Sequence, residues 1–129
     1  MNKILVEVSV GELLDKISIL EIKKEKIKDI KKLKFINDEY NVLKVQLDKN
    51  VKSDEKLNSL FKSLKEINKK LWIIEDDKRL CEKNSNFGGK FIKLSRDVHF
   101  INDDRAKIKL KINNHTGSKI KEIKEYTNY

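Results

Sequence analysis

Apolar residues recur every three or four positions along most of this chain, and that spacing restricts it to long amphipathic helices. Between residues 53 and 84 the apolar stripe comprises Leu57, Leu60, Phe61, Leu64, Ile67, Leu71 and Ile74. Between residues 91 and 113 it comprises Phe91, Leu94, Val98, Ile101, Ile108 and Ile112. The chain has no proline and only four glycines, so little in it would break such helices. The sequence therefore predicts an all-α fold.

The ends of the helices follow from local signals. Ser9 followed by Glu12 is a capping box, so the first helix is expected to begin at Val10. The alternation of Ile4, Val6 and Val8 predicts a short N-terminal extended segment before it. The turns between the long helices are short, which makes consecutive helices antiparallel neighbours. We expect one domain spanning residues 1–129, an antiparallel three-helix coiled-coil bundle with helices at about 10–49, 54–83 and 90–115 and a short C-terminal helix at about 118–126. A break in the first helix near Asn37 and Asp38 is an alternative.

Polar and charged side chains interrupt the apolar stripes. Counting back from the turns of an antiparallel bundle places Lys24 level with Lys78, Glu21 with Cys81, and Trp72 with Asn102. Buried charges are costly unless they are paired, so their position indicates a role. The predicted interior polar layer consists of Glu21, Lys24, Trp72, Glu75, Arg79, Glu82, Asn102, Arg105 and Lys109.

Two interpretations of this layer are open. In the first, it is a salt-bridge network that fixes the register of three similar helices. In the second, it is an anion pocket, because the cations Lys24, Lys28, Arg79, Arg105 and Lys109 outnumber Glu21, Glu75 and Glu82. Arginine binds carboxylate and phosphate groups through two hydrogen bonds, so such a pocket would take a small anionic ligand.

The first helix also carries apolar residues on the face opposite its main stripe, which predicts a second contact. That contact is expected with the N-terminal segment or with a second subunit. The candidate interface residues are Asp15, Lys16, Ile19, Ile22, Asp76, Arg96 and Asp103. A homodimer is the working hypothesis.

The composition excludes several classes of protein. The net charge is +9, from 30 basic and 21 acidic residues, but a nucleic-acid partner is disfavoured because the basic patches lack interleaved exposed aromatic residues. No apolar run approaches the ~20 residues of a membrane span, and the start of the chain does not resemble a signal peptide. With the single Cys81, this predicts a cytoplasmic protein. His99 and His115 have no ligand-spaced partner, so no metal or cofactor is predicted.

Three segments together resemble one family. They are Val6–Lys23; Leu71–Glu82 with Phe87; and Phe91–Val98 with Asn102–Arg105, Lys109, Ile112–Asn113 and Gly117–Ser118. The chain is similar over nearly its whole length to an uncharacterised, mostly bacterial family of unknown function (DUF6165). The resemblance implies a single-domain cytoplasmic protein and supplies no activity.

Three functional hypotheses follow from the sequence. The first is a homo-oligomeric interaction or accessory protein with an interior polar layer. The second is a small helical enzyme or binding protein that holds a carboxylate or phosphate between its helices. The third, non-specific nucleic-acid binding, rests on net charge alone. Whether the protein is an enzyme stays open.

Overall fold

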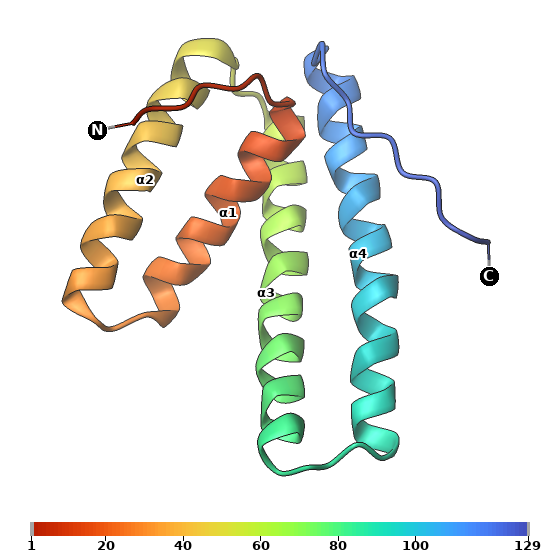
Figure 1. Ribbon diagram of the computed structural model, residues 1–129. Helices are drawn as coiled ribbons and strands as arrows, with labels where there is room; N and C mark the ends of the chain where they lie inside the picture. The colour runs from red at the N-terminus through yellow and green to blue at the C-terminus, as the bar shows by residue number, and fades with distance from the viewer. Residues whose placement is uncertain (1, 129) are drawn as a thin grey trace.

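The computed structural model describes residues 2–128 and contains four α-helices in that range (Figure 1). They are α1 (Val10–Lys26), α2 (Ile30–Asn50), α3 (Glu55–Lys83) and α4 (Gly89–Thr116). The predicted all-α class is confirmed, and the described residues contain no β-strand. The four helices differ from the predicted three long helices and one short C-terminal helix, because two helices stand where one was expected at 10–49 and none forms at 118–126.

The break in the first predicted helix lies at residues 27–29 and not at Asn37–Asp38. Ile27 is in an extended conformation, and its N–H still donates to the carbonyl of Lys23 (2.8 Å). Asp29 then caps α2 by accepting hydrogen bonds from the backbone N–H groups of Lys31 (2.9 Å) and Lys32 (3.2 Å). An N-cap carboxylate satisfies helix N–H groups that would otherwise lack partners. A single aspartate therefore starts a new helix without proline or glycine.

The other helix ends lie within one residue of the expected bounds. Ser9 accepts from the Glu12 N–H (3.0 Å), so α1 begins at Val10 as predicted. Asp54 caps α3 by accepting from the Leu57 N–H (2.7 Å). Gly117 ends α4 with φ of 65°, in the left-handed region that glycine adopts without steric cost.

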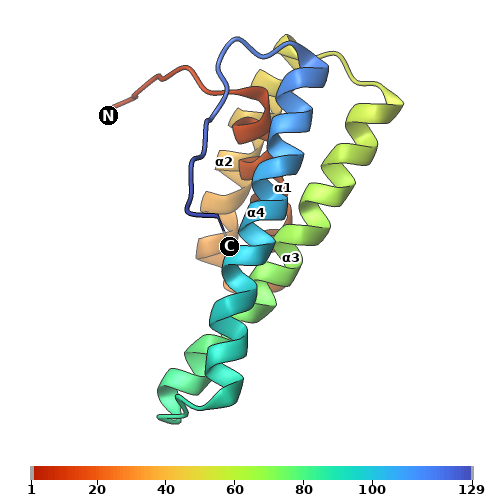
Figure 2. The ribbon, with the colours of Figure 1, turned by 90° about the vertical axis from the view of Figure 1, so that its right-hand side faces the viewer.

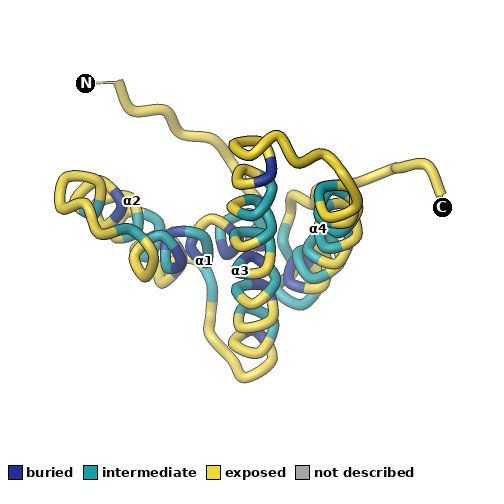
Figure 3. Tube along the Cα trace, turned by 90° about the horizontal axis from the view of Figure 1, so that it is seen from below, coloured by how far each residue is buried: buried dark blue, intermediate teal, exposed yellow. Residues whose placement is uncertain are grey.

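The four helices form two hairpins, and the α1–α2 hairpin packs across the α3–α4 hairpin. α3 and α4 are antiparallel neighbours along their whole length, α1 crosses them, and α2 folds back along α1 (Figures 1 and 3). Because α2 returns the chain, α1 runs parallel to α3, whereas the predicted three-helix bundle made them antiparallel. Side chains from all four helices meet in one core, which consists of Leu14, Ile17, Leu47, Leu57, Leu64 and Ile112.

The shorter α1 covers only part of the α3–α4 hairpin. It has 17 residues against 29 in α3, which corresponds to about 25 Å against about 43 Å of helix. The rest of the hairpin, residues 71–100, projects beyond α1 and α2 (Figure 2), and we call it the arm. Cys81 is buried within the arm, whereas Ile73 and Leu80 are each 53% exposed.

The C-terminal residues 118–128 form an extended segment, and the predicted helix at 118–126 is wrong. The Ser118 hydroxyl accepts from the Val10 N–H at the start of α1 (3.2 Å) and donates to the Ile120 carbonyl (2.7 Å). The segment then runs along α4 (Figure 1).

Candidate functional site: a buried carboxylate network and the adjoining groove

Asp15 is the centre of the main polar cluster. Its Oδ1 accepts hydrogen bonds from Asn68 Nδ2 (2.8 Å) and Arg105 Nε (3.0 Å), and its Oδ2 accepts from Arg105 Nη2. Asp15 is only 2% exposed, so its predicted place in an outward-facing interface is wrong. The cause is the crossing of α1 over the α3–α4 hairpin, which turns this side of α1 toward Asn68 on α3 and Arg105 on α4.

Neutral polar groups complete the cluster. Asn68 Nδ2 also donates to Ser18 Oγ (2.7 Å), and the Ser18 hydroxyl donates to the Asp15 carbonyl (2.7 Å). Both residues are buried. Over residues 2–128 no buried side-chain nitrogen or oxygen lacks a hydrogen-bond partner. A fully satisfied network of this kind specifies one packing arrangement, because any other would leave a polar group unpaired.

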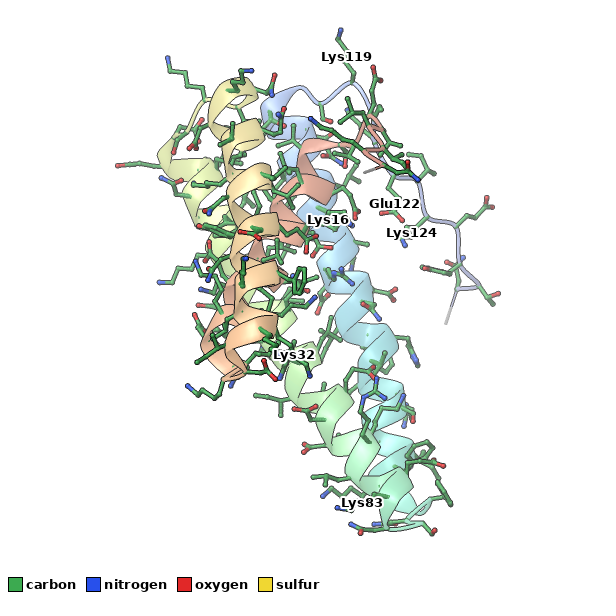
Figure 4. The ribbon with its side chains drawn as sticks, turned by 60° about the vertical axis from the view of Figure 1, so that its left-hand side comes forward. Lys16, Lys32, Lys83, Lys119, Glu122 and Lys124 are labelled. Carbon is green, nitrogen blue, oxygen red and sulfur yellow. The ribbon has the colours of Figure 1, made fainter. Side chains whose placement is uncertain are left out.

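Lys109 extends the network toward the surface. Its ammonium group lies 2.7 Å from Glu12 and 3.6 Å from Asp15, both on α1, and 3.4 Å from Glu122 on the C-terminal segment. Figure 4 shows Glu122 and Lys124 on that segment beside α4. The Lys109 side chain is 11% exposed, so this cation ties α1, α4 and the C-terminal segment together in a partly dehydrated environment.

The electrostatics of the cluster are balanced. Burial raises the pKa of the Asp15 carboxyl. Hydrogen bonds from Arg105 and Asn68 and the charges of Arg105 and Lys109 lower the pKa by more than burial raises it, so it lies below its usual value. Burial lowers the pKa of Arg105, and its contacts with Asp15 outweigh that effect and raise the pKa. Both groups are therefore ionised at neutral pH. Arg105 and Lys109 are matched by Asp15 and Glu12, which leaves no surplus of positive charge at this point.

The remaining residues of the predicted polar layer do not meet inside the bundle. Glu21 forms an ion pair with Lys65 (3.0 Å) and accepts from the Tyr40 hydroxyl (3.4 Å). Lys24 lies over the Tyr40 ring, with its Nζ 4.1 Å from the ring centre. Neither is level with Lys78 or Cys81, because α1 is parallel to α3. Four residues of the predicted layer are exposed on the surface of the molecule, namely Lys24, Arg79, Glu82 and Asn102. There Asn102 accepts a hydrogen bond from Arg105 Nη1 (3.4 Å).

A groove of about 330 Å³ adjoins the network where α1 meets the arm. Its walls combine the predicted polar layer with the predicted interface: Trp72, Glu75, Arg79 and Arg105 from the first, and Ile19, Ile22 and Asp76 from the second, together with Asn68 and Leu71. Ile22 is 1% exposed and belongs to the interior, so its assignment to an intermolecular interface is wrong. Lys16, Asp76 and Arg96 are exposed, and Ile19 and Asp103 are half-buried.

Gly11 and Asn113 are the structural residues that the predicted site lacked. The Gly11 N–H donates to Asn113 Oδ1 (2.7 Å), and Asn113 is buried. A Cβ atom on Gly11 would lie 2.7 Å from the Lys109 carbonyl oxygen, so only glycine allows α1 and α4 to approach this closely. The signal was present in the sequence, as a glycine within the first turn of a strongly predicted helix.

In residues 2–128, no group of three or more His, Cys, Asp or Glu side chains is placed so that it could hold a metal ion. In the same range, no helix combines the length and the apolar character that crossing a membrane requires.

Comparison with known proteins places the chain in a family. No curated protein and no solved structure matches it. The model of a family of unknown function, DUF6165, matches residues 4–129, which include the Asp15 network, the arm and the C-terminal segment. The chain therefore belongs to the DUF6165 family.

Proposed function

We propose that the protein is a homo-oligomeric interaction protein, in which the Asp15 network fixes the helix arrangement and exposed apolar surfaces make the contacts. The observation that carries this proposal is the exposure of large apolar side chains in a chain with 40% charged residues. Contiguous exposed apolar surface in a water-soluble protein marks contact sites, whereas isolated exposed residues do not.

Besides Ile30, Phe35, Val42 and Val45 on α2 and Leu110 on α4, the exposed large apolar residues are concentrated in two places. The first is the terminal segments, where Ile4, Leu5 and Val6 are 84%, 83% and 73% exposed, and Ile123 and Tyr126 are 80% and 65% exposed. The second is the arm, where the exposed large apolar residues are Ile73, Leu80, Phe87, Ile92 and Phe100. An arm of two helices buries only the seam between them, so its outer faces are available to a partner protein.

The balanced charges at Asp15 support the structural role of the network. Arg105 uses both Nε and Nη2 to bind Asp15, so its guanidinium group is already engaged as a two-point carboxylate ligand. A polar cluster with every group paired holds helices in register. An anion pocket would require cations that lack a carboxylate partner.

Sedimentation velocity tests the proposal. At protein concentrations of about 1–100 µM, which cover the affinities of typical specific complexes, the mass should reach at least twice the 15.2 kDa of one chain. The association should weaken on dilution. A mass of 15.2 kDa throughout this range would contradict the proposal.

A second candidate function is the binding of a small anionic ligand in the groove between α1 and the arm. The observation that favours it is the combination of an apolar wall, Trp72 and the exposed Arg79 in one groove of about 330 Å³, a size that suits a small ligand. A thermal-shift panel of dicarboxylates, phosphates and nucleotides tests it. A ligand at ~100 times its Kd should stabilise the fold by ~2.7 kcal/mol, and Arg79→Met should abolish that stabilisation.

A further inference from the structure

The two terminal segments are extended and lack backbone partners. In residues 2–128, the backbone–backbone hydrogen bonds outside the helices involve none of residues 2–8 or 119–128. The side chains of the N-terminal segment alternate, with Ile4, Val6 and Val8 on one side and Lys3, Leu5 and Glu7 on the other. β-Branched residues in alternation favour a strand. An extended apolar segment with unpaired backbone groups is a template for pairing with another strand.

The C-terminal segment offers such a strand beside a groove. Between this segment and α4 lies a hollow of about 580 Å³, with Ala106 and Leu110 of α4 on one wall and Glu122, Ile123 and Tyr126 on the other. Leu110 is 40% exposed. Added strands of this kind gain affinity from main-chain hydrogen bonds and specificity from pockets for alternate side chains.

Antiparallel pairing of the two segments is complementary at the odd-numbered positions in one register, in which Ile4 and Val6 stand opposite the charged Lys124 and Glu122. When the residue numbers of opposite positions sum to about 128, Lys3 faces Glu125, Leu5 faces Ile123, and Glu7 faces Lys121. Val8 then faces Ile120. A shift by two residues would set Leu5 against Lys121 or Glu125, which removes the apolar pair. Opposite charges and apolar pairs across strands each contribute roughly 0.2–1 kcal/mol, so this register is preferred.

The hollow beside the C-terminal segment has an apolar lining, with Ala106 and Leu110 from α4 and Ile123 from the segment. Glu122 binds Lys109 and Lys121 binds Asn114 of α4, so neighbouring residues of the segment both contact α4. A strand added beside the segment places one of its two faces against this apolar lining.

The partner strand does not come from the same copy in this structure. Val10 and Ser118 lie together at one corner of the molecule, and from there the two segments run to opposite sides (Figures 1 and 3). The C-terminal segment is held along α4 by Lys109–Glu122 and by Lys121–Asn114 (2.8 Å). We therefore propose that residues 2–8 of one copy dock as an antiparallel strand between α4 and residues 118–128 of a second copy, and that reciprocal exchange of this segment forms the dimer.

This inference rests on the proposed homo-oligomeric function and adds its interface. The test uses full-length chains that carry Cys81→Ser and one new cysteine each. A Leu5→Cys chain and an Ile123→Cys chain, distinguishable by mass, are mixed and oxidised. Directly opposite residues bring their Cβ atoms close enough for a disulfide, so a disulfide joining one chain of each kind is expected. A Val6→Cys chain mixed with the Ile123→Cys chain is the matched control, because position 6 faces the other side of the strand; we expect its disulfide to form at least about tenfold more slowly.

Three results would overturn the exchanged strand. They are a disulfide between two Leu5→Cys chains as the main product, no disulfide in the mixture, and a disulfide confined to one chain when both cysteines are placed in the same molecule. Deletion of residues 2–8 should give a monomer, lighter than the 15.2 kDa full chain by the mass of the deleted residues. Its helical circular dichroism should be unchanged, because Ser9, which caps α1, is retained. A chain that sediments as a dimer without the predicted disulfide refutes the exchanged strand and leaves the proposed function intact, whereas a wild-type monomer refutes both.

Discussion

Replacing Asp15 by asparagine should be among the most destabilising single-atom changes in this protein. The substitution keeps the size of the side chain and removes only its charge. Asp15 is 2% exposed, and the side chains of Arg105 and Lys109 are 28% and 11% exposed. The variant therefore leaves Arg105 without its carboxylate partner in a partly dehydrated site, whereas Lys109 keeps its ion pair with Glu12. The new amide also turns a donor group toward the guanidinium donors of Arg105.

The expected cost follows from these exposures. Removing one partner of a buried ion pair typically costs ~3–5 kcal/mol, because the remaining charge is left uncompensated. Arg105 can recover part of its hydration, and the asparagine keeps one acceptor oxygen, so we expect about 3 kcal/mol. With a slope near 2 kcal/mol per molar urea, this lowers the unfolding midpoint by about 1.5 M.

Urea unfolding followed by circular dichroism at 222 nm measures the effect. Both proteins must be compared at one concentration, because self-association would add to the apparent stability. Asp97→Asn is the matched control: Asp97 forms an exposed ion pair with Lys93 at 2.8 Å, and such pairs contribute only about 0.3–0.5 kcal/mol. If Asp15→Asn changes the free energy of unfolding no more than Asp97→Asn does, the Asp15 network does not fix the helix arrangement.

Three further predictions concern the same region. The folded-state pKa of Asp15 is depressed, so the contribution of Asp15 to the stability of the fold is complete above the unfolded pKa of about 3.9 and is lost as the pH falls through the folded pKa. The difference in unfolding free energy between the wild type and Asp15→Asn should therefore shrink below about pH 4 and stay constant from about pH 5 to 8. Gly11→Ala should destabilise by ~1–3 kcal/mol in the same urea assay, because its Cβ would meet the Lys109 carbonyl, whereas Gly89→Ala, which meets nothing within 4 Å, should be neutral or slightly stabilising. Arg79→Met should change the unfolding free energy by less than about 0.5 kcal/mol, since Arg79 is exposed; a loss as large as that of Asp15→Asn would restore Arg79 to an interior network.

Local sequence signals, which act between neighbouring residues, determined which segments are helical and where several helices begin and end. The apolar periodicity of residues 57–74 and 91–112 specified α3 and α4, because a helix needs one apolar stripe wherever it packs. Ser9 and Asp54 placed helix starts, since a cap acts on N–H groups two or three residues away. Gly117 placed the end of α4 for a similarly local reason.

Tertiary structure decided which faces are inside. α1 is packed between α2 on one side and the α3–α4 hairpin on the other, so the apolar residues on its second face, which suggested a second subunit, are covered within the chain. Apolar periodicity shows that a helix face is buried, but it does not show which element covers that face. The direction of α1 relative to α3 depends on whether Asp29 starts a new helix. That one reversal placed Asp15 inside and left Arg79, Glu82 and Asn102 at the surface. Which charges pair depends on the direction in which each helix runs in the folded protein. Counting residues back from the turns does not give that direction.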